Sequence, residues 1–271
     1  MHILKLFFIA IIFSNSSTVM SSEVYVLTSE GFIKDPFHAE FVDLNKRAVA
    51  DLNLGQFKIT ANEQAPSVGA GFFQPLQFTN NSTNAISLNH GDLKVSIDGS
   101  YLFRELFSTP FVTDVGAGIA NFSLQIIDFN TMNISTSFLN HTVTTAFDNN
   151  ETITESTIDQ SDSDNNGATY NIINVDANNL MAEILAPART IDAGESIGLL
   201  FSMTQASADS FGRVATDFVN TATISLTLPN GALLSNNANT DLQWVTSVPL
   251  PPAFLTFISG ILILFRINKK S

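Results

Sequence analysis

The 271-residue chain contains no cysteine, one tryptophan and three tyrosines. The absence of cysteine excludes disulfide bonds and thiolate metal sites, so the fold must depend on its apolar core. Basic residues are also scarce, because 12 Lys and Arg stand against 25 Asp and Glu, a formal net charge of −13. Such an acidic surface repels nucleic acid and anionic lipid and suits an exported protein, or one that gathers divalent cations.

The first apolar segment is typical of a secretory signal peptide. Lys5 gives the positive start, Leu6–Phe13 form the apolar stretch, and small polar residues follow. The small residues predict cleavage between Ser21 and Ser22, with 14–16 as the alternative. A membrane anchor would need about 20 apolar residues, which this stretch does not reach.

The C-terminal segment has three parts in order: a proline-stiffened joint, an apolar run and a basic end. Proline fixes φ and lacks an N–H, so the joint is rigid and non-helical. The run from Ala253 carries no charge before Arg266, which predicts a membrane helix over 253–267. The alternative is a buried helix of a globular fold. Such a helix would have a polar stripe, and none interrupts this run. The joint consists of Val248, Pro249, Leu250, Pro251 and Pro252, and the stop-transfer cluster of Arg266, Lys269 and Lys270.

These residues resemble the PEP-CTERM sorting signal in its Val-Pro-Leu-Pro variant, over Val248 to Ser271 only. Leu250 replaces the acidic residue of the commonest form, and two uncharged residues interrupt the basic cluster. The resemblance implies an exosortase-type membrane enzyme as processing partner, in a Gram-negative bacterium that makes exopolysaccharide. It also implies that the tail is removed and that the body passes to the cell surface or matrix. Phe218–Gly231 loosely resembles a late strand of such bodies.

Three regions follow: a signal peptide at 1–21, a body at 22–246 and a sorting signal at 247–271. Four of the 12 basic residues and no acidic residue lie in the end regions, which leaves the body 8 basic and 25 acidic groups, a formal charge of −17. The body is long enough for one core and shows no internal repeat. We therefore expect a single domain.

The body has the alternating pattern of an all-β fold, and we expect a single antiparallel β-sandwich, jelly-roll-like or immunoglobulin-like. The 23 phenylalanines favour packing, because Phe has no polar tip for a ligand. The residues predicted to face the core are Ala48, Ala50, Leu52, Leu54, Leu93, Val95, Ile97, Tyr101, Phe103, Phe122, Leu124, Ile126, Ile197, Leu199, Phe201, Met203, Ala222, Ile224, Leu226 and Leu228.

Local signals refine this pattern. Asp98-Gly99 predicts a two-residue hairpin turn, Ala193-Gly194-Glu195 another turn, and Pro229-Asn230-Gly231 a strand end. Phe37–Ala50 has near-helical spacing, but its alternation from Ala48 favours a strand. Asn133–Gly167 is rich in Asn, Thr, Ser and Asp and predicts a long loop or an irregular edge.

Asp162, Asp164 and Asn166, followed by Gly167, match the first half of a calcium-binding loop. Side-chain oxygens at alternate positions face one centre, and the glycine permits the sharp turn. Ile173 occupies the position where a helical calcium hand has its bidentate carboxylate. A calcium ion would therefore need a further ligand such as Asp159 or Asp176, and an unliganded polar turn is the alternative.

Other chemistry-bearing residues follow no catalytic spacing. His38, His90 and His141 lack the intervals of a zinc motif, and no serine elbow or dinucleotide fingerprint occurs. Glu151, Glu155 and Asp159 are interpreted as a solvated face. These absences favour a non-catalytic protein with no cofactor other than calcium.

Two functions are compatible with the sequence. The first is an exported, non-catalytic surface or matrix protein associated with exopolysaccharide or biofilm. The second is an exported carbohydrate-binding or glycan-hydrolysing module. Sugar platforms favour exposed Trp and Tyr, and the chain offers only Trp244, Tyr25, Tyr101 and Tyr170, so the first is preferred.

Overall fold

The computed structural model describes residues 22–28, 31–43, 46–61, 67–103, 115–148, 151–162, 167–176, 179–209, 214–230 and 232–247. Within these ranges the chain forms strands and no helix, which confirms the all-β prediction. Every pairing between described strands is antiparallel except one short parallel pair, β19 with β17. The predicted signal peptide, membrane helix and stop-transfer cluster lie outside the described residues.

Two large sheets contain most of the strands. The first has nine strands, in the order β12-β11-β10-β16-β6-β1-β2, with β7 on β16 and β18 on β7. Its strands are β1 (Val24–Thr28), β2 (Gly31–Asp35), β6 (Ser67–Phe72), β7 (Leu76–Asn80), β10 (Val115–Asp128), β11 (Asn133–Asp148), β12 (Glu151–Asp162), β16 (Ser196–Asp209) and β18 (Leu234–Asn236).

The second sheet has eight strands, in the order β13-β14-β9-β17-β5-β4-β3, with β19 on β17. Its strands are β3 (His38–Val42), β4 (Lys46–Asp51), β5 (Gln56–Ala61), β9 (Leu93–Phe103), β13 (Thr169–Val175), β14 (Asn179–Leu185), β17 (Val214–Leu228) and β19 (Val245–Ser247). A two-stranded sheet pairs β8 (Ile86–Leu88) with β15 (Arg189–Ile191).

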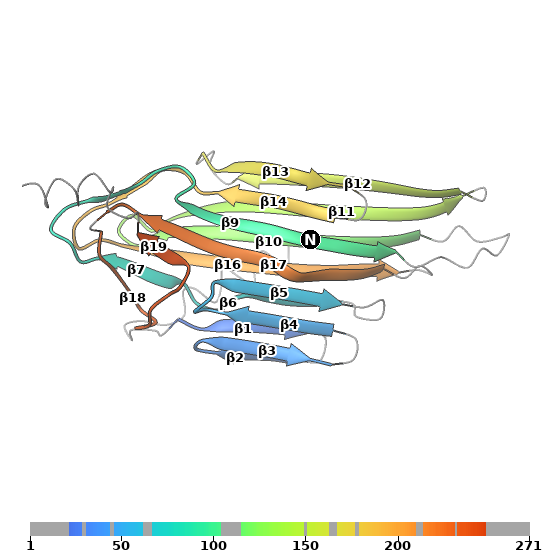
Figure 1. Ribbon diagram of the computed structural model, residues 1–271, viewed down its shortest axis with the longest axis horizontal. Coiled ribbons are helices and arrows are strands. Elements are labelled where there is room, and N and C mark those ends of the chain that lie inside the picture. The colour runs from blue at the N-terminus through green and yellow to red at the C-terminus, as the bar shows by residue number, and fades with distance from the viewer. Residues whose placement is uncertain are drawn as a thin grey trace, which may run out of the picture.

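The two large sheets lie face to face, with the long strands running along the longest axis of the molecule (Figure 1). Strands at matching positions stack on each other, with β17 against β16 in the middle and β3 against β2 at one end. The buried hydrophobic residues form one cluster that includes side chains from both sheets. Alternation along each strand thus gives each sheet one face for the core and one outer face.

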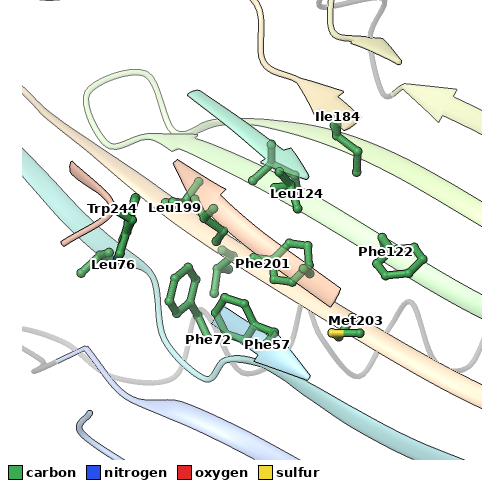
Figure 2. Close-up of a cluster of buried hydrophobic side chains, with 14 of the residues drawn as sticks. Phe57, Phe72, Leu76, Phe122, Leu124, Ile184, Leu199, Phe201, Met203 and Trp244 are labelled. Atoms are coloured by element: carbon green, nitrogen blue, oxygen red, sulfur yellow. The ribbon is translucent and has the colours of Figure 1, made fainter. Parts of the chain in front are cut away.

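Three phenylalanines join the sheets at the centre of the core (Figure 2). Phe57 on β5 packs edge-on against Phe72 on β6, with ring centroids 5.2 Å apart, and against Phe201 on β16 at 4.9 Å. All three are fully buried. Aromatic pairs at these distances contribute about 0.5–1.5 kcal/mol beyond the area they bury, so this cluster fixes how the sheets align.

The predicted alternation is confirmed in five strands. Leu54 is the exception: it is exposed because β4 ends at Asp51 and residues 52–55 form the turn into β5. The side chains of Tyr101 and Phe103 lie outside the description. The buried residues that were predicted are Ala48, Ala50, Leu52, Leu93, Val95, Ile97, Phe122, Leu124, Ile126, Ile197, Leu199, Phe201, Met203, Ala222, Ile224, Leu226 and Leu228.

The predicted hairpin at Asp98-Gly99 is wrong. β9 continues through both residues to Phe103, and Gly99 lies opposite Leu180 of β14. A type I′ turn needs positive φ, and Gly99 does not have it, whereas Gly194 does and forms the predicted turn before β16. β14 pairs with both residues, and β17 pairs with β9 on either side of them, so tertiary pairing overrides the local turn signal.

Asn133–Gly167 was predicted to form a long loop or an irregular edge; the loop is wrong, and the segment does reach the edge of a sheet. β11 and β12 form a long hairpin there, and β12 is the outer strand of the first sheet. Ser137, Leu139, His141 and Val143 of β11 are buried in alternation, but the polar residues among them obscure the pattern in the sequence. Threonine favours extended strands, which helps this polar segment to pair.

The strand preference for Phe37–Ala50 is confirmed by β3 and β4. The chain reaches β3 from β2 by crossing between the sheets in a tight corner. The Asp35 carboxylate accepts hydrogen bonds at 2.9 Å from the backbone N–H groups of Phe37 and His38. These bonds lower the pKa of Asp35, so the corner is held by an ionised carboxylate.

Candidate functional site

The predicted sorting motif begins where the last described strand ends. β19 ends at Ser247, while Val248, Pro249, Leu250, Pro251 and Pro252 lie outside the described residues, as do Arg266, Lys269 and Lys270. At the other end, Ser21 lies outside the description and Ser22 is buried. In the part of the chain that is described, no helix has the length and apolarity to cross a bilayer.

Trp244 anchors the segment that leads to the predicted joint. Its indole N–H donates a hydrogen bond at 2.8 Å to the Leu52 carbonyl, and its ring packs edge-on against Phe78 at 5.8 Å. The Trp244 carbonyl accepts a hydrogen bond at 2.9 Å from the Leu226 N–H, next to the β17–β19 pairing. The side chain is only 5% exposed. Trp244 therefore has a structural role in the core.

Gly55 makes room for this ring. Gly55 has a φ of +61°, and a Cβ added there would lie 2.7 Å from two atoms of the Trp244 indole. A side chain at this position would meet both backbone strain and a steric clash. This contact is not visible in the sequence, because 189 positions separate the glycine from the tryptophan. The only sequence signal was the presence of a single tryptophan.

The predicted calcium loop lies where the chain passes from one sheet to the other. Asp162 is the last residue of β12, Asp164 and Asn166 lie outside the described residues, and Gly167 follows with a φ of +82°. Asp176 lies beyond the seven residues of β13, roughly 23 Å along the strand, and is too far away to complete the site. It caps the next turn instead, accepting from the Asn179 N–H at 2.8 Å. Asp159 remains as an exposed acidic residue nearby.

Calcium binding stays a prediction and has a direct test. If the loop binds calcium, millimolar CaCl2 should raise the melting temperature, because a ligand that binds only the folded state stabilises it. The rise should disappear in Asp164→Asn and persist in Asp176→Asn, the matched control at the far end of β13. An unchanged melting temperature in the unmodified chain would contradict calcium binding.

The three histidines lie apart, and each has its own partners. His38 Nδ1 lies 3.1 Å from an Asp51 carboxylate oxygen, and His90 Nε2 lies 2.9 Å from the Thr169 hydroxyl. His141 is fully buried, with Nε2 at 3.0 Å from the Ser156 hydroxyl. Among the described residues, no three His, Asp or Glu side chains gather closely enough to hold a metal ion.

The outer face of the second sheet carries a polar arrangement that extends across the seven strands of its main order. One residue from each of seven neighbouring strands lies in register across this face, and we name this set the polar row. Its members are Asn171, Glu183, Ser96, Thr223, Gln56, Asp51 and His38. Neighbouring strands are about 4.8 Å apart, so the polar row presents evenly spaced amide, hydroxyl and carboxylate groups.

Glu183 is the best-connected member of the polar row. Its carboxylate accepts hydrogen bonds from Lys94 at 2.8 Å, Ser96 at 3.3 Å and Asn171 at 3.2 Å. The hydrogen bond from Lys94 is the main cause of its lowered pKa, and the one from Asn171 adds to it. Its carboxylate therefore stays ionised and accepts hydrogen bonds, which suits binding to a polar ligand better than proton transfer near neutral pH.

The polar row could not be recognised as a unit from the sequence. Alternation predicts that Ser96 and Thr223 face away from the core, but it cannot tell which strands are neighbours. Glu151, Glu155 and Asp159 all belong to β12, where Glu155 and Asp159 are exposed, as expected of a solvated face. No protein-family model, curated protein or solved structure matches this chain.

Proposed function

We propose that this protein is a non-catalytic, exported component of the cell surface or extracellular matrix. Residues 1–21 direct export, and the segment 247–271 holds the precursor in the inner membrane through a helix over 253–267. An exosortase-type enzyme then removes this tail at the Val248–Pro252 joint. The proposal rests on the resemblance of the C-terminal segment to the PEP-CTERM sorting signal.

The position of Trp244 is the structural observation that supports this route. Trp244 and β19 fasten the chain to the body just before the joint, and β19 ends at Ser247. Cleavage beyond this point would leave the core contacts of Trp244 intact. A folded body and a detachable tail are the two parts that such processing needs.

We propose that the two stacked sheets form a β-sandwich, jelly-roll-like or immunoglobulin-like, that associates with exopolysaccharide. The polar row supports this association, because polysaccharides offer hydroxyl groups to amide and carboxylate partners. Trp244 and Tyr25 are both buried, and burial raises the pKa of Tyr25. Their burial favours polymer contact through the polar row over an aromatic sugar platform.

Fractionation of the tagged full chain tests this proposal. The chain should be expressed in an exopolysaccharide-producing Gram-negative host that either carries or lacks the processing enzyme. We expect released protein whose intact mass places its C-terminus near Pro249 only when the enzyme is present. Without the enzyme the chain should remain in the membrane fraction. Mature surface protein that retains the tail would contradict the proposal and indicate a permanent anchor.

A further inference from the structure

The four strands that end the main strand orders of the large sheets differ in how they are protected against pairing with another chain. β2 and β12 end the first sheet, and β3 and β13 end the second. An outer strand presents unpaired backbone N–H and C=O groups, and proteins usually blunt such edges with charges or bulges. β12 carries exposed Glu155 and Asp159, β3 carries His38 and Glu40, and β13 has a register shift after Ile172.

β2 carries two charged residues of its own, Lys34 and Asp35, but it also exposes apolar side chains. It pairs with β1 over five residues without a register shift. Phe32 is 46% exposed and Ile33 is 41% exposed, and neighbouring residues of a strand point to opposite faces. Both faces of this edge therefore expose apolar surface.

Two contacts shape the outer face of this edge. The Lys34 ammonium lies 2.9 Å from the Glu23 carboxylate and 4.9 Å from the centroid of the Phe73 ring. Phe32 stacks on Tyr25 of β1 at 5.4 Å and lies 5.3 Å from the Phe73 ring, so its own ring leans over β1. The basic charge on β2 is thus partly neutralised, and the Phe32 ring is held in a fixed orientation by its two aromatic neighbours.

We propose that β2 pairs antiparallel with β2 of a second copy of this chain, about a twofold axis at Ile33. In this register Ile33 faces Ile33 of the second copy, Phe32 faces Lys34, and Gly31 faces Asp35. No like charges lie opposite each other, and each Lys34 faces an aromatic ring, a favourable cation–π arrangement. The two nine-stranded sheets then become one continuous sheet across an isologous interface.

The self-pairing goes beyond the proposed function and does not depend on the sorting tail. A foreign extended peptide is the other occupant that an open strand edge can accept. The self-complementary order Phe32-Ile33-Lys34 favours a second copy, because a single twofold-symmetric contact pairs the β2 edges of both copies. Each edge then gains backbone hydrogen bonds that it lacks within its own sheet.

A single introduced cysteine tests this register, because the chain has no cysteine of its own. Opposite residues of an antiparallel pair have Cβ atoms about 4.5–5.5 Å apart, close to the span of a disulfide. Purified full-length Ile33→Cys should therefore form a covalent dimer on mild oxidation, seen on a non-reducing gel. Ile173→Cys is the matched control, since Ile173 is an exposed isoleucine on the outer strand β13, and it should stay monomeric.

A charge variant separates edge pairing from association through the tail. Ile33→Lys places two ammonium groups opposite each other and should weaken the dimer by about tenfold or more in sedimentation equilibrium. Its far-ultraviolet circular dichroism should match that of the unmodified chain, and Ile173→Lys should leave the dimer unchanged. A monomeric unmodified chain, equal cross-linking of the two cysteine variants, or a dimer of full strength in Ile33→Lys would each overturn the proposal.

Discussion

Replacing Trp244 with alanine should lower the free energy of unfolding by about 3–5 kcal/mol. The side chain is 5% exposed, packs against Phe78 and donates the hydrogen bond that satisfies the Leu52 carbonyl. Alanine leaves a cavity beside Gly55, whose backbone already follows the shape of the indole. The substitution also removes the anchor of β19, so the last strand should separate from β17.

Urea unfolding of the full chain, followed by circular dichroism, measures this effect. Trp244→Phe retains a ring against Phe78 but leaves the Leu52 carbonyl without its donor, and should cost about 1–3 kcal/mol. Leu233→Ala is the control, because Leu233 is 66% exposed and its loss should change stability by about 0.5 kcal/mol or less. Equal unfolding midpoints for Trp244→Ala and Leu233→Ala would show that Trp244 does not anchor the fold.

Acid should destabilise the protein through His141. Burial lowers the pKa of His141 from 6.5 to about 4, and the charge of Asp176 only partly opposes this shift. Between these two values the unfolded chain holds a proton that the folded chain does not. The stabilisation is therefore present above about pH 6.5 and is lost as the pH falls, by about 2 kcal/mol at pH 5 and about 3 kcal/mol at pH 4.

Urea unfolding at pH 7.5 and pH 5 isolates this contribution. Asp35, Glu40 and Glu183 also have lowered pKa values, but their ordinary values are 3.8 for Asp and 4.5 for Glu, so most of their effect comes below pH 5. In His141→Gln the stability at the two pH values should differ by much less than in the unmodified chain. An equal difference in both proteins would assign the acid sensitivity to other groups.

Alternation predicted the core where one face of a strand is uniformly apolar. Leu93, Val95 and Ile97 face the core as expected, because hydroxyl and charged residues separate them. The same rule failed in β11, where Ser137 and His141 occupy buried positions between apolar residues. A buried histidine with a hydroxyl partner looks like a solvent-facing residue in the sequence. Its placement depends on β12, which supplies Ser156.

The pairing of strands that are distant in the chain could not be predicted from the sequence. The turn signal at Asp98-Gly99 was sound locally, but both residues pair with β14 and stay within β9. The polar row has the same origin, since its seven members come from strands between His38 and Thr223. Strand order decides which outward-facing side chains become neighbours, and no local pattern records that order.

The central strand of each large sheet comes from the last third of the chain. β16 lies between β10 and β6, and β17 lies between β9 and β5. A protein made from its N-terminus cannot join the two halves of either sheet before Ser196–Leu228 is available. Such non-local closure slows folding, because long loops must be ordered before their contacts form. A chain interrupted before Ser196 would consist of half-sheets with open edges, the kind of intermediate that aggregates or is degraded.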